Sequence, residues 1–225
     1  MIVIGIDFSI QYPAICIARD FNHFTWIAFV NANTTKVYQK FLEETRDHYS
    51  ALKIYFLDPR KRLAKKNETY SGTERLKLAN YSTLVDQIIE KVRIELNGEE
   101  PNVISIEGIA YGAQGNALID ISQATGMIRK ALLDHLLTGK SERLFVFSPG
   151  ELKNAIGAKG NAGKFDVFNA FIQKPKLAER SDLLSCINTN IDKIVKNQQI
   201  ASPFMDMIDA YLAVLKIHES LKESD

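Results

Sequence analysis

Four acidic residues lie in apolar segments, where burial of an ionised carboxyl group destabilises the fold unless another group compensates its charge. Asp7 interrupts the apolar run IVIGIDFS and Glu107 follows the run VISI, so each acid ends a segment with the pattern of a buried strand. Asp206 and Asp209 lie three residues apart in FMDMIDAYLAVL, on one face of a predicted helix with apolar neighbours. A local hydrogen bond, a basic partner or a shared metal ion would each compensate such a charge.

Taken singly, each acid is better explained as a cap, a turn residue or a salt-bridge partner, and only the four together indicate a common site. Four carboxylates from three separate elements form an oxygen-rich site that suits Mg²⁺ or Mn²⁺ better than zinc. Two such ions about 3.5–4 Å apart can activate a water molecule and stabilise the leaving oxygen of a phosphodiester. We therefore predict a hydrolytic site with two Mg²⁺ ions, for which Mn²⁺ can substitute, held by Asp7, Glu107, Asp206 and Asp209.

Two basic segments could contact phosphate groups. The first, SPGELKNAIGAKGNAGKFDVFNAF (148–171), carries Lys153, Lys159 and Lys164, and its glycine-rich backbone can approach phosphates closely. A flexible cationic loop before a helix is the alternative. The second, DPRKRLAKK (58–66), is either a solvated loop or a further phosphate contact; its candidate DNA-binding residues are Arg60, Lys61 and Arg62.

The elements that must position these residues have alternating strand and helix patterns. Runs over 2–8, 14–20 and 24–30 predict a three-stranded meander. Residues 73–96 have apolar residues at helical spacing, with Thr73 as the predicted N-cap and Asn97-Gly98 as the end. Further along the chain we predict strands at 102–108 and 143–147 and helices at 116–137 and 204–215.

This order predicts one α/β domain, residues 1–225, with a mixed central sheet of about five strands flanked by helices. The early hairpins would pair antiparallel and the later crossovers parallel. Residues 32–72 form an irregular elaboration that contains a helix pattern, an apolar run and the second basic segment. Residues 175–202 form another, which is polar and partly helical.

Composition excludes several classes of protein. The chain has 225 residues, 46% of them hydrophobic and 24% charged, with a formal net charge of +1, as in an ordinary globular protein. Its two cysteines form no disulfide framework or zinc pattern, and its four histidines lack metal-ligand spacing. Because the sequence has neither a signal peptide nor an apolar run of membrane-spanning length, we expect a soluble cytoplasmic protein with no membrane partner.

The ordered set of acids and lysines resembles a known family. A strand-end Asp7, a later strand-end Glu107, the basic segment 148–171 and the Asp206-x-x-Asp209-Ala motif are similar to those of RuvC-type Holliday junction resolvases in the ribonuclease H-like superfamily. The resemblance covers 1–30, 73–174 and 203–220 and leaves the two elaborations as departures. It implies a ribonuclease H-like fold in a divergent member of the kind that phages encode.

The resemblance also implies an activity and a set of contacts. Members of the family are homodimers that bind a four-way DNA junction and cut two opposing strands symmetrically, in DNA recombination and repair. Lys153 and Lys164 fall where the family has functional lysines, and Lys164 is the better candidate to contact the scissile phosphate. Residues 116–137 would form the dimer interface, where Ala117, Ser122, Ala124 and Gly126 allow close approach of helices; packing on the sheet explains these small residues equally.

Two positions depart from the family pattern. Tyr111 stands one position away from the aromatic residue that wedges into the junction in relatives, and it is retained as a candidate DNA contact. Ala210 and Tyr211 follow Asp209, where many relatives have a basic or histidine residue. Lys164 or the metal ions would then have to provide the activation.

Other functions fit part of the sequence. GIDFS resembles the first phosphate loop of actin-like and sugar-kinase ATPases, but no second Asp-Gly loop follows and 225 residues are too few for a duplicated domain. A non-catalytic branched-DNA-binding protein would be expected to lose one of the four acids. A nuclease that also cuts forks and flaps stays open, because substrate choice depends on the dimer and the elaborations rather than on the metal site.

Charge reversal of Arg60, Lys61 and Arg62 to glutamate tests the second basic segment. We expect weaker binding to a four-way junction and a flatter dependence of log Kd on log salt concentration, because fewer counterions are released, with metal affinity unchanged. Fluorescence anisotropy at several salt concentrations measures both quantities. Unchanged binding would remove this segment from the DNA interface.

Overall fold

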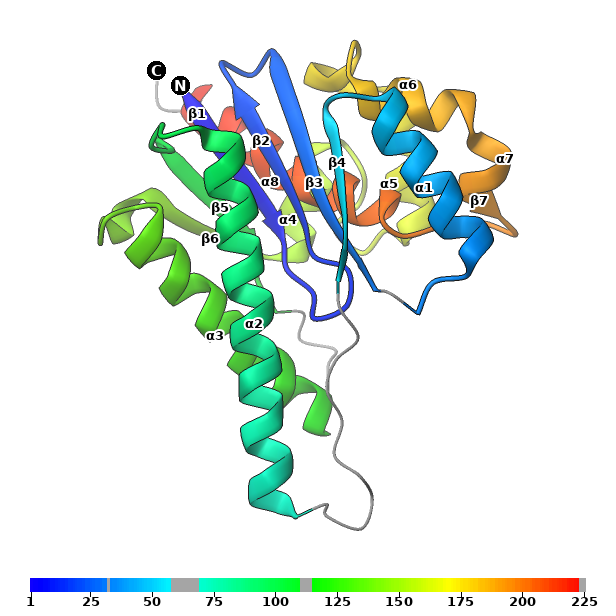
Figure 1. Cartoon of the computed structure of the whole chain (residues 1–225). Helices are drawn as coiled ribbons and strands as arrows, with labels where there is room; N and C mark the ends of the chain where they lie inside the picture. Colours follow the sequence, from blue (N-terminus) through cyan, green and yellow to red (C-terminus); the bar gives the residue numbers. More distant parts are fainter. Residues whose placement is uncertain (32, 58–68, 110–114, 223–225) are drawn as a thin grey trace.

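A mixed β-sheet forms the middle layer of the protein, and helices cover both of its faces (Figure 1). The computed structural model describes residues 1–31, 33–57, 69–109 and 115–222. Within those ranges the main sheet has six strands in the order β4-β3-β2-β1-β5-β6. The strands are β1 (Ile2–Asp7), β2 (Ala14–Arg19), β3 (His23–Asn31), β4 (Leu52–Leu57), β5 (Val103–Glu107) and β6 (Leu144–Phe147).

Strand directions divide the sheet as the sequence predicts. β1, β2 and β3 form an antiparallel meander, whereas β5 pairs parallel to β1 and β6 pairs parallel to β5. The predicted α/β fold with a mixed central sheet is therefore confirmed.

The sixth strand comes from a segment that the sequence analysis left outside the sheet. β4 pairs parallel to β3, at the edge of the sheet. Leu52 and Ile54 are at most 1% exposed, because they pack in the core on one face of the sheet. The apolar run within the first elaboration is thus a core strand, and the boundaries of the domain and of its two elaborations stay predictions.

Helices lie in two layers. α2 (Tyr70–Leu96) and α3 (Gly115–His135) pack on one face. The other face carries α1 (Lys36–His48), α4 (Pro149–Ala155), α5 (Lys164–Gln173), α6 (Asp182–Thr189), α7 (Ile191–Ile194) and α8 (Phe204–Lys222). Two short strands, β7 (Val195–Lys196) and β8 (Gln199–Ile200), form a small hairpin before α8. Among the described helices, none is long and apolar enough to cross a membrane.

Two predicted features of the helices need correction. α2 begins at Tyr70, not after Thr73, because the Thr69 side chain accepts a hydrogen bond from the Gly72 amide and caps the first turn. Its end is as predicted, with Asn97 in the left-handed conformation. The second elaboration is less polar than expected, since α6 buries Leu183, Leu184, Cys186 and Ile187. Both cysteines are free and buried.

The backbone of α8 lies close to that of β1. A Cβ atom on Gly5 would lie 2.1 Å from the Ala210 carbonyl oxygen and 2.9 Å from the Val214 amide nitrogen. The backbone of α8 therefore lies directly on β1, which only glycine permits at this position. Tyr211 of α8 is fully buried, and its hydroxyl donates a 2.7 Å hydrogen bond to the Pro175 carbonyl.

Gly5→Ala should destabilise the protein by about 1–3 kcal/mol or more, because the added methyl group collides with rigid helix backbone. Urea unfolding followed by circular dichroism measures this loss. Gly150→Ala is the matched control, since a Cβ there meets its nearest atoms at 3.7 Å; its effect should stay within about 0.5 kcal/mol. Equal stability of the two variants would show that α8 does not depend on contact at Gly5.

Candidate active site

The parallel pairing of β1 with β5 places two of the predicted acids side by side. Ile6 is in register with Ile106, and an acid follows each of them. These isoleucines face the core under α2 and α3, so the alternation of side chains directs Asp7 and Glu107 to the opposite face, where α8 lies. A hydrogen bond joins the Asp7 and Glu107 carboxyl groups.

The first two turns of α8 carry the other two acids. Asp206 is 6% exposed, and a hydrogen bond from the Ser202 side chain lowers its pKa against the larger upward effect of burial. Its Oδ2 atom is buried without a hydrogen-bond partner in the part of the chain that the structure describes. Asp209 lies one turn further along α8 and is partly buried.

Electrostatic interactions join the four carboxyl groups into one cluster. Burial raises the pKa of Asp7 well above its usual value, and the charges of Asp209, Glu107 and Asp206 raise it further. Burial and the charge of Glu107 raise the pKa of Asp209 to about 8. The pKa of Glu107 is also raised, chiefly by burial. The acids that the sequence singled out are therefore brought together, at a substantial electrostatic cost.

Two predicted lysines offset part of this cost. Lys164, the first residue of α5, lowers the pKa of each of the four acids. Lys153 of α4 lowers the pKa of Glu107 and of Asp209. Its Nζ atom also donates a 2.8 Å hydrogen bond to the Ala162 carbonyl, which ties α4 to the loop that leads into Lys164.

Lys159, a predicted phosphate contact, is not part of the acid cluster. Lys159 is exposed and lines a separate cavity with Asp166 and Asn169. Tyr211, which follows the second acid of α8, points into the core.

The candidate DNA contacts Arg60, Lys61, Arg62 and Tyr111 lie outside the described residues. On α3, Ala117, Ser122 and Gly126 are exposed, whereas Ala124 is buried.

Ser202 is a part of the site that the sequence analysis missed. Its side chain hydrogen-bonds to Asp206, and its backbone carbonyl accepts a 2.8 Å hydrogen bond from the Tyr38 hydroxyl. A serine followed by proline just before an apolar helix is a start signal that could have pointed to it. The contact from Tyr38, 164 residues away in the sequence, has no such local signal.

The chemistry of the acid cluster fits a hard divalent cation. Its donors are carboxylate oxygens, their charges repel one another, and one Asp206 oxygen is buried without a partner among the described residues. In the same ranges, however, no three His, Cys, Asp or Glu side chains are grouped closely enough to hold a metal ion. Side chains of the cluster would therefore have to turn toward a shared ion.

Comparison with known proteins gives similar solved structures but no matching family model. Thermus thermophilus RuvC is 11% identical, with a TM-score of 0.44 over 98% of this chain and 97% of that chain. T. thermophilus RuvC in complex with a Holliday junction substrate is 14% identical, with a TM-score of 0.47 over 100% and 96%. The yeast mitochondrial Holliday junction resolvase is 14% identical, with a TM-score of 0.48 over 98% and 80%.

Asp209→Asn should stabilise the protein in a pH-dependent way. Because the folded state raises the pKa of Asp209 to about 8, the carboxyl opposes folding increasingly as pH rises from about 4 toward 8. We expect the variant and the wild type to match near pH 4 and the variant to be more stable by about 1–3 kcal/mol at pH 8.

Urea unfolding in EDTA at several pH values measures this difference. Asp47→Asn is the control, because the Asp47 side chain on α1 is 70% exposed and pairs with Arg46 at the surface. An Asp209→Asn variant less stable than the wild type at pH 8 would contradict the electrostatic cost assigned to the cluster.

Proposed function

We propose that the protein is a metal-dependent endonuclease that resolves four-way DNA junctions of the Holliday type. The observation that carries this proposal is the meeting of four carboxyl groups, from β1, β5 and α8, with Lys164 at the start of α5. A cluster of acids attracts cations, and a lysine beside it attracts a phosphate group. Together the cations and the lysine can hold a phosphodiester at a hydrolytic site.

Each residue has a proposed role. Asp7, Glu107, Asp206 and Asp209 would hold two Mg²⁺ ions, which supply water activation and stabilisation of the leaving oxygen. The four acids bind cations in their ionised forms, and Lys164 favours those forms. Lys164 would also hold a phosphate oxygen of the scissile bond. Lys153, which hydrogen-bonds to the Ala162 carbonyl, would orient the loop that leads into Lys164.

Paired cuts require two copies of the site. We propose that the protein acts as a homodimer, joined through the exposed small residues of α3, with each copy cutting one of two opposing strands. The T. thermophilus RuvC structure in complex with a Holliday junction substrate shows the kind of DNA that we propose for this chain. An intracellular role in recombination or repair follows from that substrate.

The test is a cleavage assay on a synthetic immobile four-way junction with Mg²⁺. Wild type should produce paired symmetric nicks. Asp7→Asn should lower the rate at least about 100-fold by removing a metal ligand, and Lys164→Gln by about 100-fold by removing a phosphate contact. Asp47→Asn, an exposed acid on α1, should keep the wild-type rate.

Linear duplex, fork and flap substrates separate the alternatives. Equal cutting of forks and flaps would make the protein a general branched-DNA nuclease. Junction binding without cutting in either Mg²⁺ or Mn²⁺ would leave a structural DNA-binding protein and would remove the catalytic roles assigned above.

A further inference from the structure

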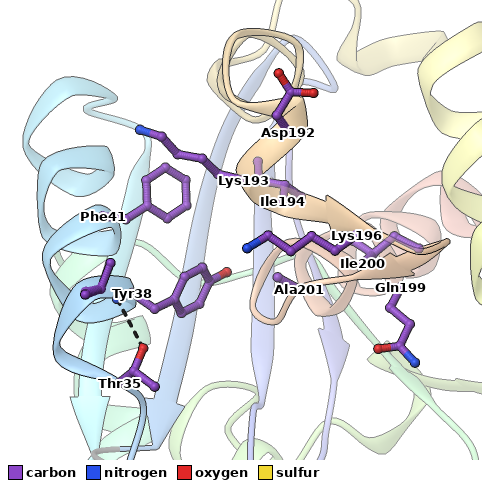
Figure 2. A pocket seen from close by; sticks show the side chains of 11 residues that line it. Thr35, Tyr38, Phe41, Asp192, Lys193, Ile194, Lys196, Gln199, Ile200 and Ala201 are labelled. Carbon is purple, nitrogen blue, oxygen red and sulfur yellow. Dashed lines mark hydrogen bonds between the residues drawn. The ribbon is translucent and has the colours of Figure 1, made fainter.

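A groove of about 530 Å³ lies between α1 and the segment that runs from α7 to the start of α8 (Figure 2). Its walls are aromatic on one side, from Tyr38 and Phe41 of α1, and aliphatic on the other, from Ile194 and Ile200. Lys193 and Lys196 also line the groove. This volume is within the range of about 300–1,000 Å³ that is typical of sites for small ligands.

The aromatic and basic side chains face the same space. The Tyr38 and Phe41 ring centroids are 5.6 Å apart, and the Lys193 Nζ atom lies 5.1 Å from the Phe41 centroid. Figure 2 shows Lys196 extending across the groove toward α1. Val37, at the groove, is 83% exposed. Asp192 also lines the groove, so its net charge is positive by one unit among the described lining residues.

Two hydrogen bonds link the lining of the groove to the acid cluster. The Tyr38 hydroxyl donates a hydrogen bond to the Ser202 carbonyl, and the Ser202 side chain hydrogen-bonds to Asp206. Burial and the charge of Asp206 both raise the pKa of Tyr38, as expected for neighbouring groups. A chain molecule bound at the acids therefore has the groove within reach of its next units.

We propose that this groove binds one unpaired nucleotide of the DNA strand that passes the acid cluster. The base would lie against the exposed part of Tyr38 and Val37, and its flanking phosphates would lie near Lys193 and Lys196. Any base can use such a surface, because every base has a π-face and every phosphate a negative charge. This inference rests on the proposed function and adds a substrate preference to it.

The groove lies partly in the second elaboration, residues 175–202, which has no counterpart in the family resemblance. An apolar small molecule would make no use of two lysines, and a fully paired duplex offers no free base to the aromatic wall. DNA with an unpaired nucleotide near the cut offers a base to the aromatic side chains and phosphate groups to the lysines. We therefore expect this protein to bind branch points that contain an unpaired nucleotide more tightly than branch points in which every base is paired.

The test measures DNA binding in Ca²⁺, without cleavage, by fluorescence anisotropy at several salt concentrations. The probes are a four-way junction and a ten-nucleotide oligothymidylate. The double variant Lys193→Gln, Lys196→Gln should bind both about ten-fold more weakly, with a salt slope flatter by about 1.4 because two single-strand phosphate contacts are lost. Val37→Glu, which adds a negative charge at an 83% exposed position, should weaken binding without unfolding the protein.

Lys40→Gln is the matched control. Lys40 is on α1, its side chain is 78% exposed, and it pairs with Glu44 at 3.9 Å rather than lining the groove. The Lys40→Gln variant should bind both DNA probes with the affinity and salt slope of the wild type. Abasic substitutions placed along the strand near the cut add a base-level readout: one position should cost the wild type about ten-fold in affinity and cost Val37→Glu nothing further.

The outcomes separate this inference from the proposed function. If the wild type cuts junctions but the groove variants bind as tightly as Lys40→Gln, with the same salt slope, the groove inference is overturned and the proposed function stands. If the wild type cuts no branched DNA, the proposed function fails. Loss of oligothymidylate binding in the groove variants would even then support the groove as a nucleotide site.

Discussion

The direct contact between the α8 backbone and β1 is the constraint on which the site depends. Gly5 leaves no side chain between them, so α8 lies close enough to the sheet for its first two turns to reach the ends of β1 and β5. Any larger residue would push the helix outward and separate Asp206 and Asp209 from the strand-end acids. The position of the four acids therefore depends on Gly5, although Gly5 itself has no side chain that could bind a ligand.

That arrangement sets electrostatics against packing. Burial raises the pKa of all four acids, and repulsion from neighbouring acids raises the pKa of Asp7 and Asp209 further. The charge of Lys164 lowers the pKa of each acid and so offsets part of this effect. The surrounding core supplies the compensating stability, since α8 is buried along most of its length. Such strain between charge and burial is common at functional sites. A bound cation would neutralise the buried negative charges. The electrostatic cost of the acids and their proposed role as metal ligands therefore both come from their buried charge.

Much of the fold could be predicted because its signals are local. Apolar runs that end in Asp7 and Glu107 predicted neighbouring strand ends, and the spacing of Asp206 and Asp209 predicted one helix face. β4 was missed because a six-residue apolar run inside an irregular segment does not indicate its strand partner. The contact between Tyr38 and Ser202 joins residues distant in the sequence, so no pattern along the chain could reveal it.

The second elaboration is attached to α8 at both of its ends. Near its start, the Pro175 carbonyl accepts a hydrogen bond from Tyr211, and at its end Ser202 leads directly into the helix. The exposed residues 196–199 of the hairpin between these anchors can therefore change in length or sequence while the acids keep their places. A chain built in this way can acquire a new substrate preference over evolutionary time without rebuilding its reaction centre.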